Sequence, residues 1–190
     1  ANIDYTLNKK SIDTFEIIFE ISDTIEKRFV NNIKVKGNDI TEETVIRNKL
    51  YFSEGDLFSQ SNIAKSLDAL KALNFFKKVN LELEDVKNSS NVNVNVLVEE
   101  QPTGEVSAGA GYGSEGAVIN FSLNEKNFLG KGMSVKSSML LGTQKVLGNV
   151  SLINPDFTDN GNSLKGSFFV SKYTYDNAGY ENKVIGSDIS

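Results

Sequence analysis

The chain of 190 residues contains no cysteine, no histidine and no tryptophan, and only two prolines. Without a thiol or an imidazole it lacks the nucleophile and the general base of most familiar catalytic arrangements, and it has no soft metal ligand. Two pairs of adjacent carboxylates remain, Glu42–Glu43 and Glu99–Glu100. Neighbouring side chains on a helix or strand point in different directions and rarely converge on one substrate atom. We therefore expect no enzymatic activity, no catalytic residue, no metal and no cofactor.

Basic charge and long apolar runs are scarce too. The chain has 20 Lys and Arg against 25 Asp and Glu, which gives a net charge of −5. Nucleic-acid-binding domains normally carry a basic stripe, so we expect no nucleic-acid partner. No apolar run approaches the roughly 18 residues that a membrane helix needs. Any contact with the interior of a bilayer must therefore be made by β-strands.

Glycine is almost absent from the first half of the chain: of 15 glycines, only Gly37 and Gly55 precede Pro102. Before Pro102 the sequence mixes helix and strand patterns, and after it short alternating segments take over. This change predicts a boundary at Pro102 between a compact unit and strands of a larger β structure.

Residues 1–21 contain two strand-like stretches, 2–7 and 11–21, around a predicted turn at 8–10. In the second stretch, Phe15, Ile17 and Phe19 share one apolar face. No helix within this segment can cover that face. The segment therefore has the pattern of a hairpin from the end of a preceding domain.

Residues 24–101 have the pattern of one β-α-α-β-β unit. Its strands are predicted at 29–36, 75–84 and 92–98, with Phe29, Ile33 and Val35 on the inner side of the first. A first helix is predicted to begin at Glu42 with Thr41 as its N-cap. A second begins after Ser59 or Ser61, and its core-facing stripe comprises Ile63, Leu67, Leu70 and Leu73.

Beyond Pro102 the chain consists of alternating segments about ten residues long. They cover residues 104–113, 117–127, 133–142, 144–154 and 163–173. In the third, Met133, Val135 and Met139 alternate with serine and lysine. Strands with one apolar and one small or polar face are typical of transmembrane barrels, which face lipid outside and water inside. A soluble β-sandwich shows the same alternation, so the pattern alone leaves both architectures open.

Three motifs follow one another in this region. Residues 109–113 read Gly-Ala-Gly-Tyr-Gly, residues 127–132 read Asn-Phe-Leu-Gly-Lys-Gly, and residues 154–157 read Asn-Pro-Asp-Phe. Their order and spacing resemble the outer-membrane protein assembly factor family BamA, where the first motif lies in a glycine-rich first barrel strand and the others form turns. The unit before them resembles that family's POTRA domain, on Ile33-Lys34-Val35-Lys36-Gly37-Asn38 and Leu73-Asn74-Phe75-Phe76.

The resemblance implies an α+β POTRA module followed by the antiparallel strands of an incomplete transmembrane β-barrel. Residues 24–101 would be the last POTRA domain before the barrel, and residues 1–23 the closing hairpin of the previous one. Residues 102–190 would supply about five strands of a sixteen-stranded barrel and end in the loop after the fifth. The family's late Val-Arg-Gly-Phe signature does not occur in the chain. We therefore expect the chain to be a fragment of a longer protein.

The function that the resemblance implies is assembly and insertion of β-barrel proteins in the outer membrane of a Gram-negative bacterium, with the POTRA part in the periplasm. Unfolded outer-membrane proteins would be the clients. The other implied partners are periplasmic chaperones, accessory outer-membrane lipoproteins, and the lipid bilayer reached through the barrel strands. Exposed strand edges can receive a client strand by β-augmentation, without a catalytic group.

Three sites are implied by the resemblance. The client-binding edge of the POTRA sheet comprises Phe75, Phe76, Lys77, Lys78, Val79, Asn80 and Leu81. The first barrel strand forms a lateral seam with Gly104, Val106, Ala108, Gly109, Gly111, Tyr112 and Gly113, in which glycine weakens side-chain packing. Arg47 and Glu54 would contact an accessory lipoprotein. Barrel curvature is the alternative explanation for the glycines, and a solvated ion pair is the alternative for Arg47 and Glu54.

Two other functions stay open from sequence. A two-partner secretion transporter or a related translocation pore also joins POTRA modules to a barrel, and a soluble periplasmic scaffold could bind chaperones or peptides. Detergent dependence separates the last from the others, because exposed barrel strands aggregate without detergent.

Overall fold

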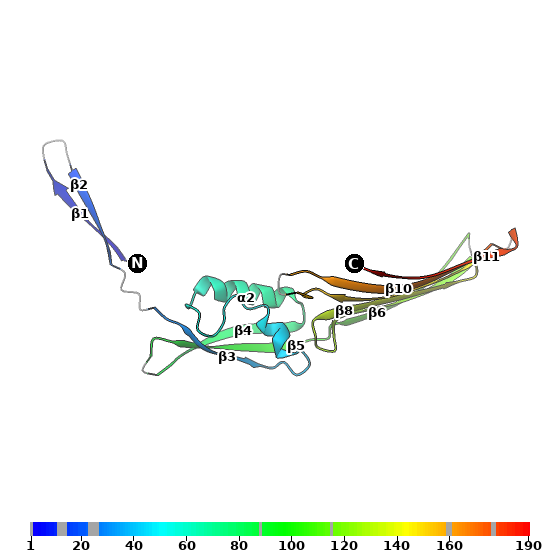
Figure 1. The fold of residues 1–190 in the computed structure, drawn as a ribbon, viewed down its shortest axis with the longest axis horizontal. Helices are drawn as coiled ribbons and strands as arrows, with labels where there is room; N and C mark the ends of the chain where they lie inside the picture. The colour runs from blue at the N-terminus through cyan, green and yellow to red at the C-terminus, as the bar shows by residue number, and fades with distance from the viewer. Residues whose placement is uncertain are drawn as a thin grey trace.

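The computed structural model describes residues 2–10, 15–22, 27–87, 89–114, 116–158, 161–175 and 178–190. These residues form eleven strands and two α-helices, and the strands make three separate sheets (Figure 1). Among these residues, no helix is long and apolar enough to cross a membrane.

The first sheet is a hairpin of β1 (Asn2–Lys9) and β2 (Phe15–Ser22), paired antiparallel. The turn predicted at 8–10 is wrong in part, because Asn8 and Lys9 continue β1 and pair with Glu16 and Phe15. The connecting residues 11–14 lie outside the described part of the chain. The apolar side chains of Phe15 and Phe19 are exposed on this hairpin.

The second sheet has the strand order β3-β5-β4, in which β3 (Val30–Lys36) runs parallel to β5 (Val92–Glu100) and β4 (Phe76–Asp85) runs antiparallel to it. Helices α1 (Glu43–Arg47) and α2 (Gln60–Ala72) pack on one face (Figure 1). Alternation along β5 buries four valines, and helix spacing places Ile63 and Leu70 in one core with the last three of them. The four valines are Val92, Val94, Val96 and Val98. Ile63 and Leu70 of the predicted stripe are confirmed, and the half-buried Leu73 packs against the core from the residue after α2. The prediction is wrong for Leu67, which is half-buried and outside the core, because the buried face of the helix turns through Ser66 instead.

Two details of this unit differ from the sequence-based expectation. An irregularity in the pairing of β3 between Val30 and Asn32 shifts the alternation, so that Val30 and Ile33 are buried and Phe29 is exposed. Helix α1 begins after Glu42 and ends at Arg47, and no side chain in the described part of the chain caps its N-terminus. Thr41 is therefore not the N-cap, and its hydroxyl has a different partner described below.

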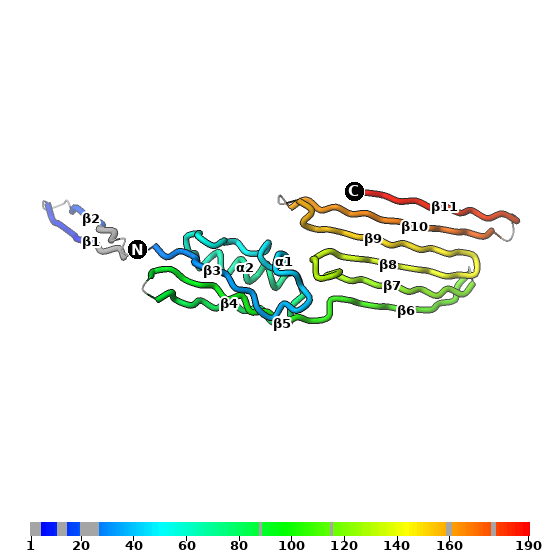
Figure 2. Tube along the Cα trace, turned by 60° about the horizontal axis from the view of Figure 1, so that its bottom comes forward, coloured from blue at the N-terminus to red at the C-terminus, as the bar shows by residue number. Residues whose placement is uncertain are grey.

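The third sheet is an open, curved, antiparallel sheet of six strands in the order β11-β10-β9-β8-β7-β6 (Figure 2). Its strands are β6 (Gly104–Gly113), β7 (Gly116–Phe128), β8 (Met133–Gly142), β9 (Lys145–Asn154), β10 (Leu164–Tyr175) and β11 (Tyr180–Ile189). The two outer strands, β6 and β11, lie at opposite edges. With the POTRA-like unit, this sheet confirms the predicted fold class.

The expectation of five strands followed by a terminal loop is wrong, because β11 is a sixth strand. Glu181 and Lys183 share a face with Ile185, so the apolar alternation that marks the other strands is lost here. Backbone pairing with β10 does not need that alternation, and it runs without a break from Tyr175–Tyr180 to Gly166–Ile189.

Candidate functional site

The predicted client-binding edge coincides with an edge strand of the POTRA sheet. Within the described residues, β4 pairs with β5 only, so its other side presents a row of backbone N–H and C=O groups. Six of the seven predicted residues lie in β4, and Phe75 immediately precedes it. Phe76 is buried, whereas Lys77 and Lys78 are exposed. One face of the edge is therefore anchored in the core and the other is polar.

A carboxylate on the neighbouring strand holds both lysines. Glu99 accepts from Lys77 Nζ at 3.0 Å and from Lys78 Nζ at 3.3 Å. The hydrogen bond from Lys77, followed by that from Lys78, lowers the pKa of the Glu99 carboxyl. All three groups are solvated, so their ion pairs position side chains more than they stabilise the fold.

The opposite edge of this sheet, β3, is closed at Ile33 by Arg47 and Glu54. Ile33 N–H donates to Glu54 Oε1 at 3.1 Å, and Arg47 Nη2 donates to the Ile33 carbonyl oxygen at 2.8 Å. Arg47 also pairs with Glu54 at 3.2 Å and with Glu43 at 2.6 Å. The two residues predicted to contact a lipoprotein thus form an ion pair that occupies the outward backbone groups of Ile33.

The pKa values in this cluster follow from those bonds. The hydrogen bond from the Ile33 amide, and then that from Arg47, lowers the pKa of Glu54. The hydrogen bond to Glu43 is the main cause that raises the pKa of Arg47. Both groups therefore stay charged at neutral pH, and the cap on β3 persists there.

The beginning of β3 is covered by main chain. Val30 N–H donates to the Asp56 carbonyl at 2.9 Å, and Gly55 N–H donates to the Val30 carbonyl at 2.7 Å. Phe29 forms an isolated antiparallel bridge with Leu57. Among the described residues, the POTRA sheet therefore has one edge, β3, that is closed along its first half and one edge, β4, that is open.

All seven predicted seam residues lie on β6, which pairs with β7 only within the described residues. Val106 and Tyr112 are strongly exposed on one face of the strand. On the other face, a methyl group added to Gly109 would lie 2.6 Å from Asn120 Oδ1. The glycine there leaves room for a polar neighbour, and side-chain packing along β6 is sparse.

The turn between β7 and β8 docks onto the POTRA unit. Asn127 is buried, its Nδ2 donates to Thr41 Oγ1 at 2.9 Å, and its Oδ1 accepts from Gly132 N–H at 2.8 Å. Glu42 N–H donates to the Gly130 carbonyl at 2.9 Å. One side chain thus closes the turn and joins it to the loop before α1.

The same turn has two consecutive residues in the left-handed region, Leu129 at φ 57° and Gly130 at φ 73°. Lys131 N–H donates to the Phe128 carbonyl at 3.2 Å, so the turn resembles type I′. A methyl group on Gly130 would overlap the carbonyl oxygen of Ile40. Glycine is required here by both the backbone angle and the close approach.

Glu100, at the end of β5, holds the POTRA side of this junction. Its carboxylate accepts from Ile40 N–H at 2.8 Å and from Thr41 N–H at 2.7 Å. Burial raises the pKa of Glu100, but hydrogen bonds from Thr41, Ile40 and Asp39 outweigh it, so the pKa lies below its ordinary value. A charged Glu100 therefore fixes the loop that meets the barrel turn.

A second barrel turn makes a further contact. Asp156, in the Asn-Pro-Asp-Phe motif between β9 and β10, pairs with Lys49 at 2.6 Å. Both turn motifs therefore touch the POTRA unit. The sequence motifs predict turns but not these contacts, because Asn127 follows three other polar residues and nothing local distinguishes it.

Both the POTRA unit and the six-stranded sheet are similar to known proteins. The POTRA family model, described as a surface antigen variable number repeat, matches residues 29–101. The outer membrane protein assembly factor BamA of Nitratidesulfovibrio vulgaris is 25% identical over 178 residues, or 92% of this chain and 22% of the relative. That of Neorickettsia risticii is 37% identical over 106 residues, or 55% and 14%.

A solved structure spans the junction. The crystal structure of BamA from Haemophilus ducreyi lacking POTRA domains 1–3 superposes with a TM-score of 0.78 and 29% identity, covering 99% of this chain and 36% of that one. This chain belongs to the BamA family. BamA family membership identifies it as an outer-membrane POTRA–barrel protein with its POTRA part in the periplasm.

The chain spans only 22% and 14% of the length of the two BamA relatives named above. CdiB from Escherichia coli also superposes over 97% of the chain, with a TM-score of 0.54 and 15% identity, a likeness that shows the fold alone.

Proposed function

We propose that this chain is part of a non-enzymatic factor that assembles and inserts outer-membrane β-barrel proteins. The observation that carries the proposal is the contrast between edges: β4 and β6 are open in the described residues, whereas β3 is closed at Val30 and Ile33. An unfolded client strand can add to an open edge through main-chain hydrogen bonds, so the reaction needs no catalytic group.

In this mechanism the two edges act in sequence. The β4 edge, from Phe76 to Leu81, holds a client segment in the periplasm while Lys77 and Lys78 keep the edge soluble. The β6 edge then templates the first client strand in the membrane, where an unpaired edge is costly. Because side-chain packing along β6 is sparse, the seam can open without disrupting a hydrophobic core.

The partners belong to the same proposal. Residues 1–23 would close a preceding POTRA domain that covers the exposed face of β2, and periplasmic chaperones would deliver clients to these modules. An accessory lipoprotein would meet Arg47 and Glu54 on their solvent side, where both side chains are partly exposed. The ion pair and the lipoprotein contact are compatible, since the pair uses only part of each polar group.

A reversible lock on the seam tests the proposal. In the full-length protein, a cysteine at Ser107 or Ala108 is paired with a cysteine on the last barrel strand. Oxidation should stop client insertion and reduction should restore it, while each single-cysteine variant stays active under both conditions. Normal porin insertion with the crosslink fully formed would contradict the role of the β6 edge.

A POTRA–barrel translocation pore is the second candidate, because a pore of that kind would have the same fold as this chain. Transport through a closed barrel lumen does not require the seam to part. Continued export of a soluble passenger with the seam locked, together with unchanged insertion of barrel proteins, would favour the pore.

A further inference from the structure

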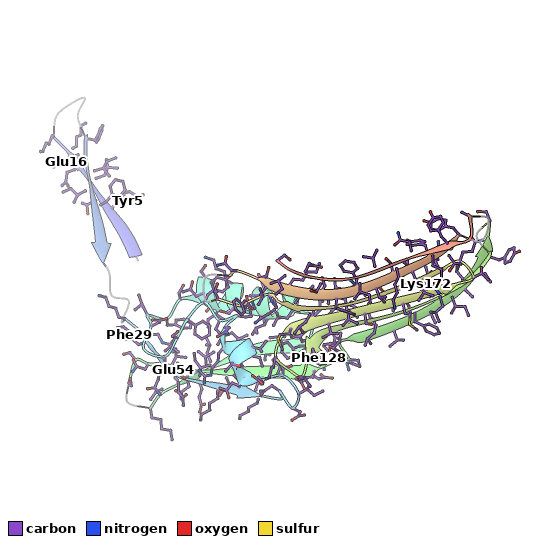
Figure 3. All side chains as sticks on the ribbon, turned by 45° about the vertical axis from the view of Figure 1, so that its right-hand side comes forward. Tyr5, Glu16, Phe29, Glu54, Phe128 and Lys172 are labelled. Atoms are coloured by element: carbon purple, nitrogen blue, oxygen red, sulfur yellow. The ribbon has the colours of Figure 1, made fainter. Side chains whose placement is uncertain are left out.

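Three apolar side chains are exposed where the POTRA unit meets the barrel turn. Ile40 and Leu129 are each 69% exposed, and Phe128 is 37% exposed. Together with Pro102 and Gly104 they line one open groove of about 700 Å³. Figure 3 places Phe128 at the end of the six-stranded sheet that meets the POTRA unit. Two chain segments far apart in sequence thus present one apolar patch, Ile40–Phe128–Leu129.

The patch is continuous with the apolar face of the six-stranded sheet. Phe128 lies opposite Met133, and Met133 shares its face with Met139, which pairs with Phe121. Phe128 would point to the other face of the sheet without the pairing irregularity between Glu125 and Phe128. The irregularity therefore turns Phe128 outward, onto the face that a barrel of this family presents to lipid.

The backbone conformation that holds the patch in place is unfavourable at Leu129. Leu129 adopts a positive φ, which is uncommon for a bulky side chain, although asparagine or glycine would make the same turn readily. Ile40 is held by the Glu100 carboxylate and by its close approach to Gly130. Strain that keeps an apolar side chain in solvent indicates a function for that side chain.

We propose that Ile40, Phe128 and Leu129 form a membrane anchor, which places the tip of the β3–α1 loop at the boundary between headgroups and acyl chains of the inner leaflet of the outer membrane. Lipid is the occupant because the patch extends the lipid-facing surface of the sheet, and an aromatic side chain at its rim is typical of that boundary. The anchor restricts rotation of the POTRA unit about Pro102 and keeps the β4 edge at a constant distance from the membrane. It rests on the outer-membrane location and not on the client-strand mechanism.

Lipid-based quenching tests the anchor in the full-length protein, cleared of other cysteines and reconstituted in phosphatidylethanolamine–phosphatidylglycerol vesicles. An environment-sensitive dye is attached at Ile40→Cys, at Val106→Cys as the lipid-facing reference, or at Leu57→Cys as the matched control. Leu57 is 54% exposed and bridges to Phe29, which Figure 3 places at the POTRA end away from Phe128. Nitroxide-labelled lipids should quench the dye at 40 nearly as strongly as at 106, and leave the dye at 57 unchanged.

A second variant separates membrane contact from turn structure. Leu129→Asn suits the positive φ, so the turn and the fold should be preserved, but the apolar side chain is lost. Lipid quenching at position 40 should fall by about half or more if the side chain anchors the loop. Unchanged quenching at 40 in this variant would remove Leu129 from the anchor.

The remaining outcomes overturn the anchor in distinguishable ways. Quenching at 106 but not at 40 means that the loop stays in water. Protection of position 40 only after other assembly proteins are added means that a protein covers the patch. Absence of quenching at 106 contradicts the membrane placement of the sheet, and the anchor fails with it.

Discussion

The POTRA unit and the six-stranded sheet bury different kinds of side chain. Every hydrophobic residue that is buried in the described chain lies between Val30 and Val98, whereas the buried side chains of the sheet are the polar residues Asn127, Ser151 and Ser167. A sheet without helices to cover it leaves its apolar face exposed. The first unit is therefore held by its own core, whereas the second has no buried hydrophobic side chain among the described residues.

The largest expected effect is the difference in folding and solubility between the two parts when each is expressed alone. Residues 26–101 expressed alone should unfold in one cooperative thermal transition, because their core is complete. Residues 102–190 alone should aggregate in detergent-free buffer, because both sheet edges and the apolar face are exposed. Calorimetry and light scattering of each piece provide the measurement. A cooperative transition for residues 102–190 without detergent would remove the distinction between the two parts.

Within the POTRA unit, the core of α2 should dominate stability. Leu70 is fully buried, so Leu70→Ala in residues 26–101 should lower the free energy of unfolding by about 2–5 kcal/mol. Lys71→Ala is the matched control, since Lys71 is its exposed neighbour on the same helix. Denaturant unfolding of both variants gives the comparison. Equal, small losses for the two would mean that Leu70 does not support the core.

The smallest effect concerns Glu100, whose charge holds the loop on the POTRA side of the junction between the two parts. The pKa of Glu100 is lower in the folded state than the ordinary value of about 4.3, so its bonds to Ile40 and Thr41 stabilise the fold above that value. This stability is lost as the pH falls through the folded pKa. Amide NMR shifts of Ile40 and Thr41 should titrate with a midpoint below the ordinary value, and Glu100→Gln should abolish the titration. A midpoint above the ordinary value would contradict this.

Sequence patterns predicted the parts of the fold that depend on periodic burial. The stripe of Ile63 and Leu70 and the alternation of β5 are strong because each position contributes separately to one core. Local irregularities do not leave such a pattern. The shift near Val30 exchanged the expected roles of Val30 and Phe29, and β11 forms although its apolar alternation is weak.

The candidate sites were less accessible from sequence, because they depend on which segments meet. Nothing local to Arg47 or Glu54 indicates that both bind the main chain of Ile33, 14 and 21 residues away. Threonine is a residue type that favours the N-cap position, but the hydroxyl oxygen of Thr41 accepts a hydrogen bond from Asn127, 86 residues along the chain. Long-range partners of this kind require the packed structure.

The most direct test of the central claim compares an open edge with a closed edge of the same sheet. A photo-crosslinking residue replaces either Asn80 on β4 or Asn32 on β3, two exposed asparagines, in the full-length protein. During assembly, an unfolded barrel protein should crosslink to position 80 and not to position 32, because backbone groups beside position 32 are occupied by Arg47, Glu54 and the 55–57 segment. Equal crosslinking at both positions, or crosslinking at 32 alone, would contradict the claim that clients bind at open strand edges.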